Sequence, residues 1–214
     1  MARFSSLVAI LLVVCAAVPI KAQWTNTDSS LGIGMAAPRF FDFPVMGFYT
    51  GPYPEKSIQE LSPFDSLVFK RTEWGCEISY APPWFFPAHA KLDYDMLYLK
   101  VLSISNDMVL VETNKLTGQS SWLARDQVQV FFWPEFLLRT HSVEAKNNRK
   151  ADLRIKGLDH ASAVNTTYTM LHPVQVQEYW MQVQLLNADL QILDYAWLKW
   201  RDAAGLLIDY SLLD

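Results

Sequence analysis

Apolar and polar residues alternate along much of this chain in short runs that are separated by turn-forming residues. An alternation with a period of two places every second side chain on one face of a strand. Turn signals such as Asn106-Asp107 and Thr117-Gly118 recur about every 8–12 residues, which is the spacing of a β-sandwich or a small barrel. The clearest β-like runs are residues 76–80, 96–104, 108–113, 128–131 and 180–186. This pattern predicts an all-β protein.

Less regular segments complete the predicted elements. Pro134 lies near the start of an apolar run, a position that proline favours in helices, so a short helix is expected over residues 133–138. Residues 185–193 are compatible with a helix, although Asn187 and Asp189 weaken that interpretation. A strand and a turn are predicted over residues 45–53, and further short strands at residues 66–70, 153–156, 167–171, 174–177, 195–200 and 206–210.

One β unit occurs twice in the sequence. Trp122-Leu123 and Trp197-Leu198 each follow a β-like run and a turn, and each is followed closely by an arginine and an aspartate. In small barrels of short strands a tryptophan of this kind usually fills the interior. The repeat therefore predicts one small β fold used twice, with Trp122, Trp180 and Trp197 in its cores.

The segments between and around the two copies differ in composition. Residues 23–44 show no sustained period, residues 139–152 are polar and basic, and residues 71–95 gather prolines and aromatic side chains. We interpret them as a loose lead, a linker and an insertion. The predicted organisation is a signal peptide at 1–22, the lead at 23–44, a first unit at 45–138 with its insertion near 71–95, the linker at 139–152 and a second unit at 153–214.

The repeated unit resembles the bacterial SH3-like barrel family. In the second copy, Trp180-Met181-Gln182-Val183 resembles its Trp-x-x-Val strand, and Ala196-Trp197-Leu198 resembles its Gly-Trp-Ile/Leu signature. The first copy has Ser121-Trp122-Leu123, so a small residue replaces the usual glycine in both copies. The resemblance implies two SH3-like barrels in tandem.

A more specific resemblance is to a group of exported proteins from Bacteroidetes-type bacteria. It covers roughly residues 45–214 and implies a fold and an exported location, with no catalytic residues. The segments that carry it are Trp84-Phe85-Phe86-Pro87-Ala88-His89, Lys91-Leu92-Asp93-Tyr94-Asp95, Trp133-Pro134-Glu135-Phe136-Leu137 and Trp197-Leu198-Lys199-Trp200-Arg201.

The first 22 residues have the organisation of a secretory signal. Arg3 supplies a positive charge, residues 7–18 are almost continuously apolar, and Ala22-Gln23 offers a cleavage site. The apolar run is shorter than the roughly 20 residues that a membrane span needs. A retained anchor and a lipoprotein modified at Cys15 are the alternatives. We therefore expect export to the periplasm or the outside of the cell, and not an integral membrane protein.

Charge narrows the choice of partners. The whole chain carries a formal charge of −4, and removal of Arg3 and Lys21 with the signal makes the mature chain more acidic. A dispersed negative charge argues against nucleic acid and against electrostatic docking on anionic lipid. The expected partner is a peptide, a glycan or another protein of the cell envelope.

Two groups of residues are candidates for binding that partner. Trp84, Phe85 and Phe86 form either an exposed aromatic platform or a cover over the end of the barrel. Asp93 and Tyr94 lie in the same insertion. Late in the second copy, Trp200 and Arg201 offer contacts to an acidic peptide or a wall carboxylate, although an ordinary charged strand face explains them equally well.

No catalytic or metal-binding pattern stands out. Cys15 leaves with the signal, so Cys76 is the only cysteine of the mature chain and no internal disulfide forms. Cys76 with a histidine is the minimum for a thiol hydrolase, but the residues that follow it do not predict the helix that usually activates such a thiol. The histidines lack metal-ligand spacing, so neither a metal nor another cofactor is expected; they are His89, His141, His160 and His172.

The sequence favours an exported, non-enzymatic binding or scaffold protein of the bacterial envelope. Its contact surface is expected to be the aromatic insertion and the cleft between the two units. A Cys76-dependent cell-wall hydrolase and a purely structural oligomerisation subunit are the alternatives.

Overall fold

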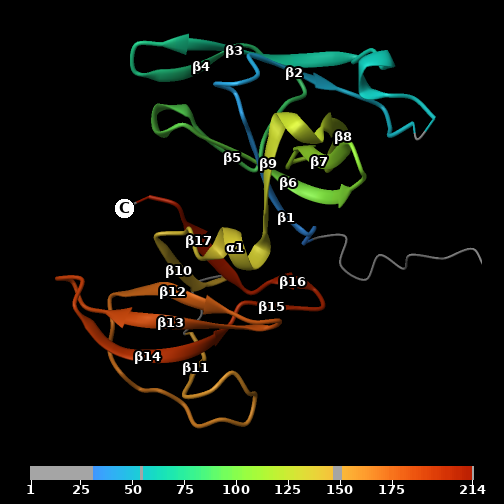
Figure 1. Ribbon diagram of the computed structural model, residues 1–214. Coiled ribbons are helices and arrows are strands. Elements are labelled where there is room, and N and C mark those ends of the chain that lie inside the picture. The colour runs from blue at the N-terminus through green and yellow to red at the C-terminus, as the bar shows by residue number, and fades with distance from the viewer. Residues whose placement is uncertain (1–30, 54, 147–150, 214) are drawn as a thin grey trace, which may run out of the picture.

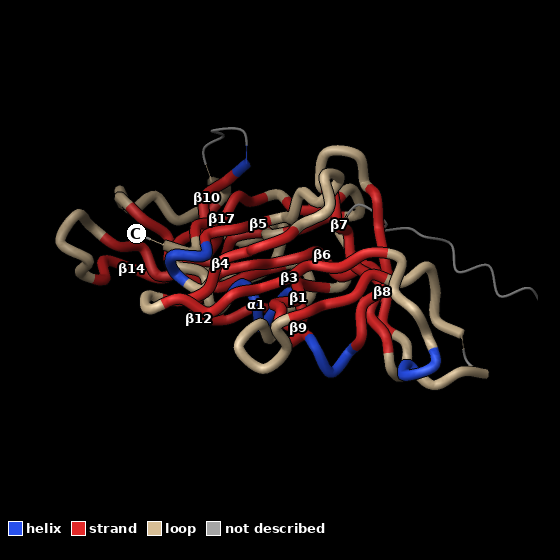
Figure 2. The backbone as a smooth tube through the Cα atoms, turned by 90° about the horizontal axis from the view of Figure 1, so that it is seen from above, coloured by secondary structure: helices blue, strands red, loops and turns tan. Residues whose placement is uncertain are grey.

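The protein is all-β, as the alternating pattern predicted. The computed structural model describes residues 31–53, 55–146 and 151–213, and the predicted signal peptide lies outside these residues. Strands run through most of the described chain, and the helical segments are short (Figure 2). Two sheets are stacked one above the other in Figure 1, with α1 between them.

The first sheet has the antiparallel strand order β8-β7-β6-β1-β9. A 3-10 turn, η3 (Arg125–Gln127), joins its last two strands in sequence, and β5 (His89–Lys91) pairs with β6. The last of these strands in the sequence, β9, therefore pairs with the first, β1. The strands are β1 (Gly34–Pro38), β6 (Met96–Ile104), β7 (Met108–Asn114), β8 (Gln119–Ala124) and β9 (Val128–Phe132).

A smaller three-stranded sheet, β2-β3-β4, covers the first sheet (Figure 1, top). Tyr49 and Trp122 exchange backbone hydrogen bonds of 2.9 and 3.0 Å, which join the smaller sheet to the edge of β8. Phe48 and Leu67 share one buried core with Leu123. The elements of this segment are β2 (Val45–Phe48), η1 (Ile58–Glu60), β3 (Asp65–Thr72), β4 (Gly75–Tyr80) and η2 (Leu92–Tyr94).

The second sheet repeats the order of the first. Its strands follow the order β11-β14-β13-β12-β10-β17, so β14-β13-β12-β10-β17 corresponds to β8-β7-β6-β1-β9. A small hairpin, β15 (Arg201–Asp202) with β16 (Gly205–Leu206), takes the place of η3. The strands are β10 (Ser142–Ala145), β11 (Leu153–Arg154), β12 (Met170–Val176), β13 (Trp180–Leu186), β14 (Ile192–Lys199) and β17 (Ile208–Ser211).

The helix α1 (Trp133–Leu137) lies between the two sheets, at the position predicted for a short helix. Its side chains Trp133, Phe136 and Leu137 are buried in one cluster with residues of both sheets, such as Met35 of β1 and Met181 of β13. The two copies therefore share a continuous apolar core.

The prediction of a loose lead over residues 23–44 is wrong for residues 34–38, which form β1 between β6 and β9. Its sequence, Gly-Met-Ala-Ala-Pro, has no β-branched residue, so it carries little local strand signal. Small residues are required here because a Cβ on Gly34 would lie 2.1 Å from the Phe131 carbonyl oxygen. Tertiary packing, not propensity, makes this strand.

The linker predicted at residues 139–152 also contains a strand. Ser142–Ala145 forms β10, which pairs with β12 on one side and β17 on the other. Of its side chains only Val143 is buried, so its composition is that of a loop. Because β1 ends at Pro38 and β6 begins at Met96, the insertion is longer than predicted and spans residues 39–95.

The tryptophans of the repeat are not the core residues that were predicted. Trp122 and Trp197 are half-buried, whereas Leu123 and Leu198 are 0% and 3% exposed. Neighbouring side chains on a strand point to opposite faces, so only one residue of each Trp-Leu pair enters the core. Trp180 is buried, as expected. The helix considered over residues 185–193 does not form, since the segment belongs to β13, a turn and β14.

Candidate functional site

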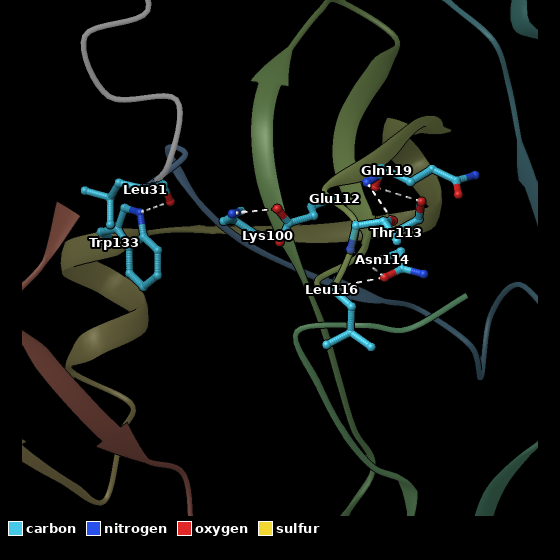
Figure 3. A network of polar contacts seen from close by, with 9 residues as sticks. Leu31, Lys100, Glu112, Thr113, Asn114, Leu116, Gln119 and Trp133 are labelled. Carbon is cyan, nitrogen blue, oxygen red and sulfur yellow. Dashed lines mark hydrogen bonds and ion pairs between the residues drawn. The ribbon is translucent and has the colours of Figure 1, made fainter. Parts of the chain in front are cut away.

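Aromatic packing fixes the two sheets against each other. The Trp133 indole lies 6.4 Å from the ring of Trp200 and 6.5 Å from that of Tyr210, measured between ring centroids. Its Nε1 donates to the Leu31 and Gly32 carbonyl oxygens, each at 3.2 Å (the Leu31 bond is drawn in Figure 3). Burial raises the pKa of Tyr210 to about 12. This rigid layer forms the floor of the space between the copies.

A cleft of about 460 Å³ opens above this floor, within the range of about 300–1,000 Å³ that is usual for ligand sites. Both copies contribute to it. Its apolar wall includes Met35, Trp133, Leu206 and Tyr210, and its charged side chains are Lys100, Glu112, Lys115 and Lys146.

The charges of the cleft are unbalanced. Lys100 Nζ lies 2.7 Å from Glu112 Oε1, and both side chains are largely buried (Figure 3). Lys115 Nζ donates to the Ala88 carbonyl oxygen at 3.2 Å, and Lys146 Nζ donates to that of Leu206 at 3.5 Å. Among the described residues that line the cleft, three ammonium groups thus meet one carboxylate, in a chain with a net charge of −4. The cleft is a local positive site on an acidic protein.

The turn that carries Lys115 is held in place by its own polar contacts. Asn114 Oδ1 accepts from the Leu116 and Thr117 backbone N–H groups at 2.9 and 3.1 Å, and Asn114 Nδ2 donates to the Trp84 carbonyl oxygen at 2.7 Å. The Leu116 bond is visible in Figure 3. Lys115 is therefore presented from a rigid turn that is also bound to the insertion.

His89 lies next to the cleft-lining residue Ala88. Its pKa is lowered, first by burial and then by the positive charges of Lys115 and Lys91. Its Nε2 is buried and has no hydrogen-bond partner within the described part of the chain. The repulsion of a proton at His89 is consistent with the positive character of this region.

The aromatic insertion is mostly a cover, which was the alternative to an exposed platform. Trp84 packs edge-on against Phe48 at 5.0 Å, and Phe85 lies 5.9 Å from the same ring. Both are partly buried against the first core. Phe86 is exposed, and Lys115 Nζ lies 5.1 Å above its ring. Only Phe86 among the three brings the insertion to the rim of the cleft.

The other predicted binding residues do not lie together at the cleft. Asp93 and Tyr94 are exposed on η2, away from the residues that line the cleft. Trp200 is only 2% exposed, so its prediction as a contact residue is wrong; its Nε1 donates to the Gln177 carbonyl oxygen at 2.9 Å. Arg201 Nε donates to the Glu178 carbonyl oxygen at 2.7 Å, which gives it a role in bracing the β12–β13 turn.

The cleft lysines were missed by sequence reasoning. Lys100 is one of several polar residues on an alternating strand, and Lys115 and Lys146 are single charges in turn-like segments. Nothing in their spacing links them, because the fold brings them together from β6, the β7–β8 turn and the end of β10. The clearest available signal was their contrast with the acidic composition of the mature chain.

Cys76 is a free, buried thiol. Its pKa is raised, first by burial and then by the carboxylates of Asp95 and Glu77. A nucleophilic thiol needs the opposite environment, in which positive groups stabilise the thiolate. The geometry thus gives no support to a Cys76 hydrolase.

A second pocket, of about 600 Å³, lies between η1 and the β6–β7 turn. Its charged residues are Asp107, Arg125 and Asp126, so it has no excess of positive charge. It is built from the first copy alone. Within the described ranges, no cluster of histidine, cysteine and acidic residues suits a metal ion, and no helix is long and apolar enough to cross a membrane.

Comparisons with protein-family models, with curated proteins and with solved structures gave no match to this chain.

Proposed function

We propose that this chain is an exported, non-enzymatic binding protein of the bacterial envelope, built from two SH3-like barrels, that holds an acidic peptide segment in the cleft between them. The periplasm or the cell exterior is its location. The repeated strand order supports the tandem arrangement. The excess of ammonium groups in the cleft is the observation that carries the proposed ligand class.

Carboxylates are the groups that such a cleft attracts. Lys115 and Lys146 are exposed, and within the described residues they donate hydrogen bonds to carbonyl oxygens, which do not neutralise their charge. A side-chain carboxylate placed between them gains charge-assisted hydrogen bonds. The neighbouring Phe86, Leu206 and Tyr210 offer apolar surface to the rest of a peptide.

The cleft is also preformed. The shared core of α1 fixes the relative position of the two sheets, so a ligand does not have to order them. Binding to a preorganised site loses less conformational entropy than binding to a site that must close.

The test uses the mature chain and a short labelled peptide of alternating alanine and glutamate, followed by fluorescence polarisation. Lys115→Glu and Lys146→Glu are each expected to weaken binding by about tenfold or more, which corresponds to about 1.4 kcal/mol. Added salt is expected to weaken binding by the wild type, because exposed charges are screened.

Lys156→Glu is the matched control, since it makes the same charge change on an exposed lysine after β11. The counterpart peptide with glutamine in place of glutamate is the ligand control. Equal affinity of the cleft variants and the Lys156 variant, or equal binding of the two peptides, would refute the proposal. Mass spectrometry of the exported protein, with an expected N-terminus at Gln23, tests its location.

A further inference from the structure

Two hairpin tips of the first copy lie side by side, away from the cleft. The β3–β4 turn contains Trp74, and η2, which contains Tyr94, follows β5; both tips project to the same side in Figure 1. Gly75 allows their close approach. It has φ +145°, and a Cβ at this position would lie 3.0 Å from Asp95 Oδ1.

The tip of the β3–β4 hairpin exposes an unusually large apolar side chain. Trp74 is 87% exposed, and no other large hydrophobic side chain in the described ranges is as exposed. Tyr94 is 55% exposed, and Lys91 Nζ lies 4.2 Å above its ring. Large exposed aromatic groups that are held on rigid elements mark contact surfaces, because their exposure contributes nothing to folding.

The charges around these rings narrow the choice of ligand. Glu73, Asp93 and Asp95 are exposed on the same two tips, and Lys91 is a nearby cation. This excess of carboxylates disfavours an anionic lipid surface. It also disfavours the acidic peptide proposed for the cleft. Carboxylates are instead good acceptors for hydroxyl groups.

We propose that Trp74, Tyr94, Asp93 and Asp95 form a saccharide-binding site, which we call the tip site. The flat C–H face of a pyranose ring packs on the indole, whose negative π face attracts C–H groups. The two carboxylates accept hydrogen bonds from ring hydroxyls. The tip site shares no residue with the cleft, so this inference does not depend on the acidic-peptide proposal.

The mature chain is titrated with soluble β-linked oligomers of glucose and of N-acetylglucosamine, in a calorimeter. At least one oligomer is expected to bind. Trp74→Ala is expected to raise its Kd by about tenfold or more, and Tyr94→Ala by a smaller factor. Trp74→Phe keeps a ring for stacking and is expected to retain most of the affinity.

Leu116→Ala is the matched control, because Leu116 is 73% exposed on another turn of the same copy. It is expected to leave saccharide binding unchanged, as is Lys115→Glu in the cleft. Because Trp74 is so exposed, its variants are expected to fold, and thermal unfolding checks this. In the wild type, the bound oligomer is also expected to protect tryptophan emission from acrylamide, and this protection is lost in Trp74→Phe.

Three results would overturn the tip site. The first is no heat and no protection with either oligomer at millimolar concentration. The second is equal binding by the wild type and Trp74→Ala. The third is a different occupant that requires Trp74: either phosphatidylcholine–phosphatidylglycerol vesicles in a sedimentation assay, or a second copy of the chain in size-exclusion chromatography over a range of concentrations.

Discussion

The two copies of the β unit share a strand order, which we call the frame, and differ in the segments that connect the strands. Counted along the chain, the five strands are β1, β6, β7, β8 and β9 in the first copy and β10, β12, β13, β14 and β17 in the second. In each copy the first strand lies between the second and the fifth, and the fourth pairs with the third. The tryptophan of the fourth strand pairs with the segment that follows the first strand in both copies: Trp122 with Tyr49, and Trp197 with Arg154. The repeat thus extends beyond the residues that first revealed it.

The copies differ where the fourth strand ends. The Arg125 backbone N–H donates to the Asp107 carbonyl oxygen, and the Trp200 N–H makes the matching bond to that of Tyr179. The first position carries an exposed charge, and the second carries an indole that is packed against Trp133. One copy therefore keeps a solvated turn, and the other uses the same backbone position to build the contact between copies.

They differ again between the first and second strands. Residues 39–95 fill this connection in the first copy and include the tip site, whereas residues 146–169 fill it in the second. The tip site thus lies wholly within a connection, whereas the cleft takes residues both from frame strands, such as Lys100 and Glu112, and from connecting segments, such as Lys115. The position of the tip site is the usual one for a binding surface, on a variable connection of a rigid scaffold.

The largest difference between the copies in the stability lost on mutation is expected at the end of the fourth strand, which is β8 or β14. Trp200→Ala removes a fully buried indole and is expected to lower the free energy of unfolding by about 3–5 kcal/mol. Arg125→Ala at the corresponding backbone position is expected to cost less than about 1 kcal/mol, since its side chain is exposed. Urea unfolding followed by circular dichroism measures both. Similar losses at the two positions would show that the copies are not differentiated there.

The shared part of the frame is tested by its leucines. Leu123→Ala and Leu198→Ala each open a cavity in a closely packed core, and each is expected to cost about 2–5 kcal/mol. Leu116→Ala, on an exposed turn, serves as the control and is expected to change stability by less than about 0.5 kcal/mol. A large loss in one copy with a negligible loss in the other would break the structural equivalence of the two hairpins.

These leucines also show how far the sequence leads. The alternating runs at β6, β7 and β13 were predictable because each strand buries one face, and the repeat was visible because the hairpins around Trp122 and Trp197 are similar. The face that each tryptophan occupies was not predictable from the pair Trp-Leu alone. Both residues are apolar, so the pattern does not say which of them points inward.

The first strand of each copy was missed for a physical reason. β1 and β10 are short, and their local sequences do not favour a strand. They form because a neighbouring strand on each side supplies backbone hydrogen bonds. The cleft is a similar case. Its lysines come from distant positions, so their grouping depends on a strand order that no local pattern contains.

A smaller contrast is expected at one cross-strand pair. Lys100 opposes Glu112 in the first copy, and His172 opposes Gln184 at the matching step of the second. Glu112→Gln removes the carboxylate from a largely buried ion pair and is expected to cost about 1–3 kcal/mol. Gln184→Ala is expected to cost less than about 1 kcal/mol, because its bond to Tyr195 is long and exposed. Equal losses of unfolding free energy in the two variants, measured by chemical denaturation, would mean that the ion pair adds no stability to the first copy.

The smallest effect is expected in the pH dependence of the first copy. Since the pKa of folded His89 lies below 6.5, the unfolded chain takes up this proton first as the pH falls from about 7 to about 5. Stability due to this group is therefore complete at neutral pH and declines with acidification. His89→Gln is expected to flatten that decline, and Lys115→Met to flatten it partly, because burial is the larger cause of the shift. Urea midpoints measured across this pH range provide the test, and an unchanged slope in His89→Gln would remove the link between this histidine and the positive rim of the cleft.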